Sequence, residues 1–510
     1  MTDARRQGPA PRLAVIGAGP AGLAAALAAA RHGLRVTLVD AGPEAGGQFY
    51  RQPAAGLSAR RPQALHHHRR GWERLRAGLD RLVGAGLVTH LRDHHVWCVT
   101  RRRSGFTVHA LLGPEQERPV EVPADGVLLA TGGYEKVLPF PGWTLPGVVT
   151  AGGAQAMLKG GLVLPGRTAV VAGTGPLLLP VATGLAAAGA RVAALVESAD
   201  PRAFVRRSPA LAARPDKLAE GAHYAARLLR HGVRTLLHHT VVEAHGDERD
   251  RRLEGVTVAA LDAAGRVRPG TRRRIDCDTL AVGHGMLPHT DLAESLGCRI
   301  DEVAVHVDDE QRTDVPGVWA AGEATGVGGA VLALAEGHIA GRSAAARLSG
   351  REPDPRGWAG AARARAGLRR FATAMDNAYA PPAHWTEHVT DDTVVCRCEE
   401  VTGGAVRRAV TELGAGDVRT VKLLTRAGMG WCQGRMCGPA VAGLTGCPET
   451  AARKPFARPV PLGVLARAGS DGDGDGDGDG DQCYVTCRSD HPDHPDHPDH
   501  PDHPDPPEEP

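Results

Sequence analysis

The stretch from Leu13 to Asp40 constrains the fold of this chain more than any other. An apolar run at 13–16 leads directly into Gly17-Ala18-Gly19-Pro20-Ala21-Gly22, and an alanine-rich segment follows before a second apolar run that ends at Asp40. This order predicts a strand, a glycine turn, a helix and a second strand. The three glycines permit a tight turn, close backbone approach to a pyrophosphate, and close packing of the helix on the strand. The helix N-terminus favours the anion, and Asp40 is placed to bind a ribose hydroxyl. We therefore predict a dinucleotide site here, rather than the glycine-rich turn of an ordinary α/β domain.

A second stretch repeats this pattern with one defect. An apolar run at 169–172 precedes Gly173-Thr174-Gly175-Pro176, and a further apolar run ends at Glu197. Leu178 stands where the third glycine or an alanine would let the helix pack closely, so a dinucleotide of ordinary geometry is doubtful there. Three alternatives remain for this second motif: a nicotinamide site, a vestigial structural domain, or a site for a different nucleotide.

Later apolar runs complete the two units. The run at 126–133 predicts a buried strand that ends in a glycine turn, and the run at 279–285 ends the second unit in the same way. A further run at 315–326 contains Gly322-Glu323 and precedes helix-forming sequence at 330–348. Two nucleotide-binding units closed by a late segment resemble the two-dinucleotide-binding, Rossmann-like flavoprotein fold of the α/β class. In that fold an FAD domain is split by an inserted nicotinamide-type domain.

The resemblance implies which residues contact the flavin. In this fold a Gly-Asp pair of the late segment contacts the ribityl and phosphate groups, and Gly322-Glu323 matches that pair with a longer acid. Carried over position by position, ten residues are expected to line FAD: Gly17, Gly19, Gly22, Asp40, Gly47, Gln48, Thr131, Gly132, Gly322 and Glu323. No Cys-x-x-Cys occurs before residue 396. The sequence therefore lacks the redox-active cysteine pair that a disulfide-reductase mechanism requires.

Four cysteines near the C-terminal end form two close pairs that 33 residues separate: Cys396, Cys398, Cys432 and Cys437. Four thiols in this pattern suit a metal centre. A Cys-x-Cys pair departs from the usual spacing of structural zinc sites, and the common ferredoxin spacings do not match either, so spacing alone leaves zinc and iron–sulfur open. The segment resembles the small helical bacterioferritin-associated-ferredoxin (BFD) type of domain. That resemblance implies that the four cysteines hold a [2Fe-2S] cluster.

These patterns predict six segments. The FAD-binding domain is expected at 11–140 and 285–350, with a nicotinamide-type domain between them at 141–284. A helical linker is expected at 351–390 and the BFD-like domain at 391–467. The remaining residues, 468–510, consist largely of Asp-Gly and His-Pro-Asp repeats. Such repeats lack the hydrophobic residues that would offset the entropy of ordering, so we predict a disordered tail.

Composition argues against several functions. The 60 basic and 58 acidic residues leave a net charge of +2, which produces no long-range field for attracting nucleic acid or an anionic membrane. Two uncharged stretches, 13–30 and 168–190, are long enough to span a bilayer, but glycine-proline turns interrupt both, and no transmembrane segment is predicted. Ten scattered cysteines do not form a secreted disulfide framework. We expect a cytoplasmic protein, with any association with a membrane made through its partners.

The flavoprotein motifs and the cysteine-bearing segment, taken together, resemble a more narrowly defined family. The sequence from Gly46 to Pro53, the second glycine motif and the unit at 396–402 resemble the FAD-binding alpha or B subunit of one family. This family includes opine oxidases, hydrogen cyanide synthase and dye-linked proline or hydroxyproline dehydrogenases. The likeness runs from about Arg12 to about Ala466.

The family implies a division of labour between subunits. An opine or an amino acid such as glycine, proline or hydroxyproline is oxidised in a separate amine-oxidase-like flavoprotein subunit, and a small ferredoxin-like subunit is a further expected partner. This chain then relays electrons through its FAD and its cluster. No catalytic base or nucleophile stands out, which suits a relay. Two alternatives stay open: a self-sufficient NAD(P)H-dependent flavin reductase, and a non-catalytic assembly subunit.

Overall fold

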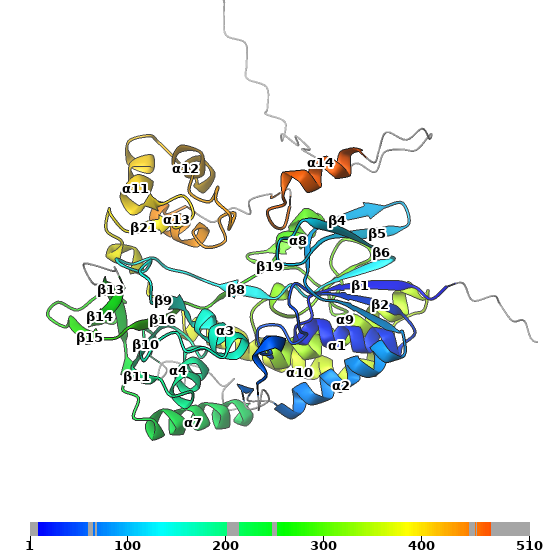
Figure 1. Cartoon of the computed structure of the whole chain (residues 1–510), viewed down its shortest axis with the longest axis horizontal. Coiled ribbons are helices and arrows are strands. Elements are labelled where there is room, and N and C mark those ends of the chain that lie inside the picture. Colours follow the sequence, from blue (N-terminus) through cyan, green and yellow to red (C-terminus); the bar gives the residue numbers. More distant parts are fainter. Residues whose placement is uncertain are drawn as a thin grey trace, which may run out of the picture. The chain divides into compact units, whose positions relative to one another are not determined.

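The computed structural model describes residues 9–59, 65–66, 69–200, 214–246, 252–447, 454 and 456–470. All of these residues lie within one compact part of the chain, 1–473. The repeats of the tail lie outside the described residues, so disorder in the tail stays a prediction. The described chain is a mixed α/β protein with two parallel sheets, which confirms the predicted fold class (Figure 1).

The first sheet is parallel and has the order β20-β7-β1-β2-β3. Its strands are β1 (Arg12–Ile16), β2 (Arg35–Val39), β3 (Val88–Leu91), β7 (Gly126–Leu129) and β20 (Val318–Ala320). The last of these strands follows the whole second unit in sequence, yet it pairs with β7. The chain thus returns to the sheet it started from, which is the split arrangement that the resemblance implies.

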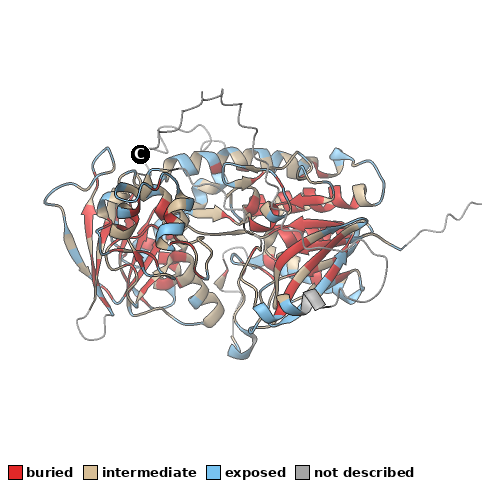
Figure 2. Cartoon of the chain, turned by 90° about the horizontal axis from the view of Figure 1, so that it is seen from above, coloured by how far each residue is buried: buried red, intermediate tan, exposed pale blue. Residues whose placement is uncertain are grey.

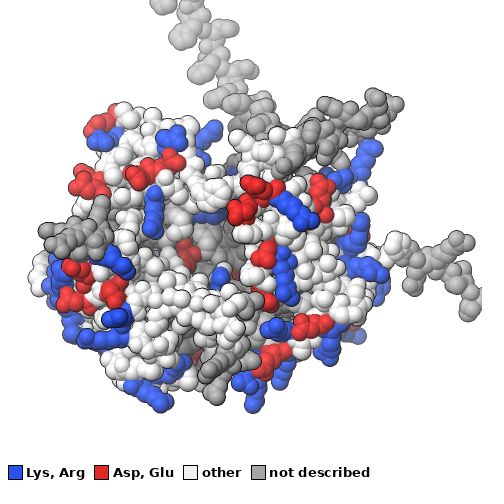
Figure 3. All heavy atoms as spheres, viewed as in Figure 1, with Lys and Arg blue, Asp and Glu red and all other residues white. Residues whose placement is uncertain are grey.

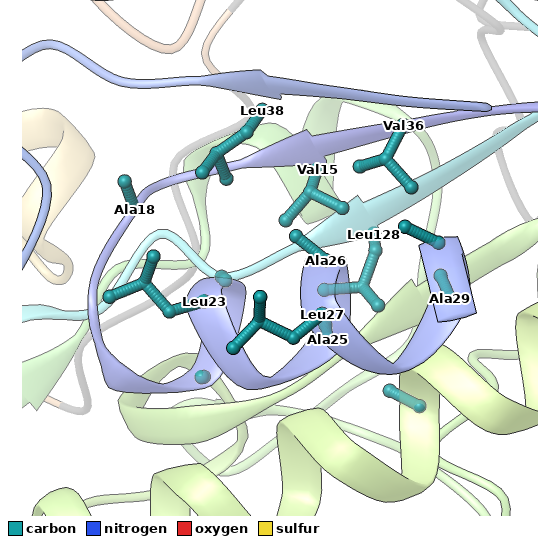
Figure 4. Close-up of a cluster of buried hydrophobic side chains, with 14 of the residues drawn as sticks. Val15, Ala18, Leu23, Ala25, Ala26, Leu27, Ala29, Val36, Leu38 and Leu128 are labelled. Carbon is teal, nitrogen blue, oxygen red and sulfur yellow. The ribbon is translucent and has the colours of Figure 1, made fainter. Parts of the chain in front are cut away.

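Helices α1 (Pro20–Arg31) and α9 (Ala330–Leu348) pack together against one face of the first sheet. Figure 4 shows side chains of β1 and β2, such as Val15 and Leu38, pointing toward Leu23 and Ala26 of α1. The two helices approach at backbone distance, because a Cβ on Gly337 of α9 would lie 2.0 Å from the carbonyl oxygen of Ala21. Helix α2 (Arg69–Gly84) packs beside α1.

The second sheet is also parallel and has the order β12-β11-β10-β16-β9. Its strands are β9 (Val148–Thr150), β10 (Thr168–Gly173), β11 (Arg191–Glu197), β12 (Thr235–Leu237) and β16 (Thr279–Gly283). Three helices pack on one face: α3 (Ala151–Gly161), α4 (Leu178–Ala187) and α7 (Pro215–Arg230). A three-stranded antiparallel sheet packs on the other: β13 (His239–Gly246), β14 (Leu253–Ala260) and β15 (Arg273–Asp276).

Smaller elements join and cover the two units. A second antiparallel sheet packs on the first parallel sheet: β4 (His94–Arg102), β5 (Gly105–Leu112) and β6 (Arg118–Ala124). Strands β8 (Gly133–Glu135) and β17 (Met286–Pro288) pair where the chain passes between the units. The short elements α8 (Asp291–Ser295), β18 (Ile300–Asp301) and β19 (Ala304–Val305) follow. Figure 2 shows the buried residues concentrated in the strands and in the helices packed on them.

The cysteine-bearing segment forms a small module with its own core. After α10 (Ala359–Ala378), it comprises β21 (Val394–Cys396), β22 (Val401–Thr402), α11 (Gly403–Thr411), α12 (Val418–Thr425) and α13 (Gly438–Thr445). Buried aliphatic residues such as Val406, Val421 and Val441 fill that core. The chain then returns to the body, which consists of the two parallel sheets and the elements packed on them between Arg12 and Leu348. There Val464 of α14 (Leu462–Ser470) packs against Trp97. No helix among the described residues combines the length and the apolar character that a bilayer crossing requires.

Candidate functional site

The first glycine turn lies between the end of β1 and the start of α1. Gly17 has a φ of +102°, and a Cβ there would lie 2.3 Å from the carbonyl oxygen of Ala130 at the end of β7. A Cβ on Gly22 would lie 1.8 Å from the carbonyl oxygen of Gly17. No side chain of the described residues caps the N-terminus of α1, where Gly19 is the N-cap. The first N–H groups of α1 are therefore suited to an anion such as a pyrophosphate.

The segment after β2 closes against this turn. Gly46 N donates to the carbonyl oxygen of Ala18 at 2.8 Å, and a Cβ on Gly47 would lie 2.8 Å from Gly19 Cα. The structure thus brings Gly47 to the glycine turn, as the carried-over site requires. Gln48 has an exposed side chain whose amide oxygen accepts from Arg51 Nε at 3.2 Å.

Asp40 lies at the carboxyl end of β2, beside the same turn. Its Oδ1 accepts from Ala18 N at 3.2 Å. Burial raises the pKa of Asp40 to about 6, although backbone hydrogen bonds from Ala18, Gly42 and Ala41 oppose this shift. The carboxylate is therefore ionised at neutral pH and can accept from a ribose hydroxyl.

Thr131 and Gly132 lie in the turn that follows β7. Thr131 Oγ1 donates to the carbonyl oxygen of His289 at 2.6 Å, and His289 N donates to the carbonyl oxygen of Gly132 at 3.0 Å. These two bonds tie the turn to the segment that follows β17.

Gly322 and Glu323 begin a 3-10 turn, Gly322–Thr325, which is separated from the end of β20 by the single residue Ala321. Glu323 Oε1 accepts from Gly329 N at 2.9 Å, whereas Glu323 Oε2 is buried and has no hydrogen-bond partner among the described residues. Burial raises the pKa of this carboxyl. A buried oxygen without a partner fits a ligand that carries hydroxyl groups, such as the ribityl chain of a flavin.

Two residues that the sequence did not single out hold this 3-10 turn in place. Glu336 of α9 is 1% exposed, and its Oε2 accepts from Gly322 N at 3.0 Å. Arg369 of α10 donates from Nε to Glu336 Oε1 at 2.9 Å and from Nη2 to Thr325 Oγ1 at 2.7 Å. One feature of the sequence could have drawn attention to Glu336: it is the only acidic residue in the largely apolar helix at 330–348.

The second glycine motif differs from the first in its local geometry. Helix α4 begins at Leu178, two residues later in its motif than α1, which begins at Pro20. Leu178 itself is 1% exposed and belongs to the hydrophobic core between the second sheet and its helices. Gly175 N donates to Glu197 Oε2 at 3.0 Å, and Thr174 Oγ1 donates to the carbonyl oxygen of Tyr379 at 3.0 Å. Polar groups of this motif are thus bound by the chain itself.

The four predicted cluster cysteines line one cavity of about 270 Å³. Cys396 and Cys437 are buried, Cys432 is half-buried and Cys398 is exposed. The neighbouring thiol of Cys437 lowers the pKa of Cys432, even though burial opposes this shift. Among the described residues, no three His, Cys, Asp or Glu side chains surround one ion-sized position.

The walls of this cavity come from both the module and the body. Trp143, Val148 and Val282 of the body line it together with Met436 of the module. Trp143 Nε1 also donates to the carbonyl oxygen of Val394 at 2.6 Å. Four soft thiol ligands in a largely apolar cavity fit an iron–sulfur cluster.

Two protein-family models match this chain. Residues 11–343 match the model of the pyridine nucleotide-disulphide oxidoreductases, and residues 394–444 match the BFD-like [2Fe-2S] binding domain. The chain belongs to the pyridine nucleotide-disulphide oxidoreductase family and carries a BFD-like domain. Its cofactors are accordingly FAD and a [2Fe-2S] cluster.

Similar proteins confirm the narrower resemblance. Hydrogen cyanide synthase subunit HcnB of Pseudomonas aeruginosa is 35% identical over 84% of this chain and 90% of its own length. An opine oxidase subunit of Rhizobium meliloti (strain 1021) is 33% identical over 89% of this chain and 97% of its own length. The crystal structure of L-proline dehydrogenase from P. horikoshii has the same fold, with a TM-score of 0.58 and 19% identity over 90% of this chain and 81% of that chain. The chain is an FAD-dependent oxidoreductase whose relatives are named as subunits of larger enzymes.

Proposed function

We propose that this chain is the electron-transfer subunit of a heteromeric dehydrogenase or oxidase that acts on an amino acid or an opine. Its partner is an amine-oxidase-like flavoprotein subunit that takes the electrons from the substrate. The observation that carries the proposal is the cavity of the four cysteines, because Trp143, Val148 and Val282 of the flavoprotein body form part of its wall. A one-electron centre built onto a flavoprotein body suits a relay better than turnover of a substrate at one site.

The proposed FAD site uses the ten residues that the resemblance implies. The turn at Gly17, Gly19 and Gly22 and the first N–H groups of α1 hold the pyrophosphate, while Asp40 orients a ribose. Gly47, Gln48, Thr131 and Gly132 border the cofactor. Gly322 sets the turn that presents Glu323, whose Oε2 has no partner among the described residues and accepts a hydroxyl hydrogen bond.

The proposed cluster site uses the thiolates of Cys396, Cys398, Cys432 and Cys437. When bound, FAD supplies two-electron chemistry and the cluster supplies one-electron chemistry. The part of this chain is to line the thiol cavity with apolar side chains and to keep the two sites in fixed positions.

The second glycine motif supports entry of electrons from a partner rather than from NAD(P)H. In a working motif the second glycine lets the backbone approach the pyrophosphate. Here the amide of Gly175, which is that glycine, donates to Glu197. The Glu197 carboxyl therefore occupies a hydrogen-bond donor that a dinucleotide would need.

The decisive experiment compares the lone chain with the chain co-expressed with an amine-oxidase-like subunit of the same organism. Dye reduction is followed with proline, hydroxyproline, glycine and opines as substrates, and with NADH and NADPH as controls. We expect dye reduction only with both subunits present and with one of the amino-acid or opine substrates. Dye reduction by the lone chain with an amino acid contradicts the proposal, and rapid bleaching of its flavin by NADH favours a self-sufficient reductase. A flavin that no donor reduces favours an assembly subunit.

A further inference from the structure

Asp291 is a buried carboxylate on which three cationic or polar side chains converge. It is the first residue of α8 and is 6% exposed. Its Oδ2 accepts from Arg435 Nε at 2.6 Å, and its Oδ1 accepts from Lys454 Nζ at 2.9 Å. His289 Nε2 lies 3.2 Å from Oδ2. Burial alone would raise the pKa of Asp291, but the hydrogen bond from His289 and the charges of Lys454 and Arg435 lower it below its ordinary value.

Arg435 connects this carboxylate to the loop that carries two of the cysteines. It lies between Cys432 and Cys437 in sequence, and its side chain is 16% exposed. Its Nη1 donates to the carbonyl oxygen of Cys432 at 3.1 Å, and its Nη2 contacts the carbonyl oxygen of Ala457. One guanidinium thus binds the cysteine loop, the flavoprotein body and the segment that follows the module.

The other end of this network reaches the proposed flavin site. His289 is bonded through its backbone to Thr131 Oγ1 at 2.6 Å and to the carbonyl oxygen of Gly132 at 3.0 Å. Polar contacts therefore connect the turn after β7 to the cysteine loop. The backbone of His289 is bonded to that turn, its ring lies 3.2 Å from Asp291, and Arg435 donates both to Asp291 and to the carbonyl oxygen of Cys432.

Two more contacts fasten the module on either side of this network. At its start, Trp143 Nε1 donates to the carbonyl oxygen of Val394 at 2.6 Å. After its end, the ring of Phe456 packs edge-on against Trp97 with a centroid separation of 5.1 Å. The module is bound to the body before, within and after its cysteine loop, so removal of one contact leaves the others in place.

A buried ionic group of this kind is expensive to maintain. Desolvation of a buried carboxylate and its cations offsets much of their attraction, and apolar residues of similar volume often give equal stability. We therefore expect this ionic group to act mainly by fixing the relative positions of the segments it joins, and less by stabilising the fold.

We propose that Asp291 and Arg435 are positioning residues that hold the cluster-bearing loop at a fixed place relative to the flavin turn, so that electrons pass between the two sites without movement of the module. This inference rests on the proposed relay function. In the relay, a bound FAD would supply two electrons and two protons, and a cluster held by the four cysteines would take the electrons one at a time. The protons would pass to solvent, and one equivalent of a one-electron oxidant such as ferricyanide would reoxidise the cluster after each electron.

The test uses the full chain loaded with both cofactors. The informative variant is Asp291→Asn, which keeps the size of the side chain, removes its charge and touches no cysteine. The matched control is Asp391→Asn, because Asp391 pairs with Arg407 at 2.6 Å inside the module and is exposed. In each protein we would measure FAD and iron content, the paramagnetic spectrum of the reduced cluster, hydrogen exchange of the amides at 430–437, and the rate at which photoreduced flavin reduces the cluster.

We expect Asp291→Asn to keep its FAD and iron, to exchange the amides at 430–437 faster, and to transfer electrons severalfold more slowly, because the rate of electron tunnelling falls exponentially as the distance between the two centres grows. The control should match the wild type. The double variant Asp291→Asn with Arg435→Gln should be no slower than the slower single variant, because both changes remove one interaction.

The outcomes separate this inference from the proposed function. A wild-type rate and wild-type exchange in Asp291→Asn overturn the positioning role, and so does loss of iron in that variant, which would make Asp291 a residue for cluster assembly. Additive slowing in the double variant overturns the pairing of Asp291 with Arg435. If photoreduced flavin of the wild-type protein does not reduce the cluster at all, the relay function itself is wrong.

Discussion

Asp40 directly follows β2 and Glu197 is the last residue of the corresponding strand β11, yet their carboxylates bind different amides. Asp40 Oδ1 accepts from Ala18 N, the residue before the second glycine of the first motif. Glu197 Oε2 accepts from Gly175 N, which is the second glycine of its own motif. Burial raises the pKa of Asp40 to about 6 and that of Glu197 to about 7. The two carboxylates thus bind amides that differ by one position in the motif, and in the second motif the amide of the second glycine is bound by the chain itself.

The raised pKa of Asp40 predicts that FAD binding depends on pH. A ribose hydroxyl donates to the ionised carboxylate, so the affinity of the apoprotein for FAD should fall as the pH drops through about 6. For one proton the loss is at most about tenfold per pH unit below that value. Fluorescence titration of apoprotein with FAD between pH 5 and 8 measures this. Asp40→Asn should bind FAD more weakly at pH 8 and lose the pH dependence, and the same pH dependence in both proteins would contradict the assigned role.

Gly17→Val should abolish FAD retention. The new Cβ would lie 2.3 Å from the carbonyl oxygen of Ala130, at a residue whose φ of +102° disfavours any side chain. The turn would have to move out of the path of the pyrophosphate. Flavin released on denaturation of the purified protein reports the FAD content. Gly84→Ala at the exposed end of α2, where a Cβ meets nothing within 4 Å, serves as the control. A full complement of FAD in Gly17→Val would refute the N-terminal assignment.

Replacement of any one of the four cluster cysteines by Ser should remove the iron and the paramagnetic signal of the reduced protein while FAD stays bound. A [2Fe-2S] cluster of this type needs all four thiolates. Cys447→Ser provides a matched control, because Cys447 follows α13 but does not line the cavity of the four thiols. Iron and acid-labile sulfide analysis measures the outcome. One zinc ion per chain without sulfide would show that the site is structural.

At the scale of elements, the parts that follow from local pattern were predictable. The strand–turn–helix–strand unit at 12–39 and helix α9 at Ala330–Leu348 lie where the sequence predicts them, because their apolar spacing, glycines and flanking turns all agree. The contacts that join elements were not predictable. Glu336 and Arg369 are 33 residues apart, and Arg435 and Asp291 are 144 apart. The pattern of apolar residues in one segment carries no information about which charged residue of a distant segment will pair with it.

The packing of α9 on α1 gives a prediction at this scale. A Cβ on Gly341 would lie 2.3 Å from the carbonyl oxygen of Ala25, so Gly341→Ala must push the helices apart. Overpacking of this kind costs about 1–3 kcal/mol of stability. Gly360→Ala in α10, where a Cβ meets nothing within 4 Å, should instead be neutral or stabilising by about 0.5–1 kcal/mol. Thermal unfolding followed by flavin release compares the two, and equal midpoints would contradict the close approach.

At the scale of the whole molecule, the charge pattern and the two sites fit a subunit that docks through specific contacts. The net charge is +2, and acidic and basic side chains are interspersed over the face seen in Figure 3. Such a surface provides little long-range steering, so the proposed partner subunit would be recognised through short-range complementarity. The sequence indicates that two redox centres share this chain, and the structure adds how the cysteine loop is fastened to the body.

The order of the two centres leads to a prediction for the complete enzyme. If electrons enter at the flavin and leave through the cluster, Cys396→Ser in the complex with its amine-oxidase-like partner should still let the substrate bleach the flavin of this chain once. Turnover with ferricyanide should then fall to the slow rate at which reduced flavin reacts with the dye directly, because the one-electron exit is missing. Rapid mixing with substrate separates the single bleaching from steady-state dye reduction, and the Cys447→Ser complex should show both at the wild-type level. Undiminished turnover in Cys396→Ser would place the cluster outside the path of the electrons, whereas loss of the first bleaching as well would place it ahead of the flavin.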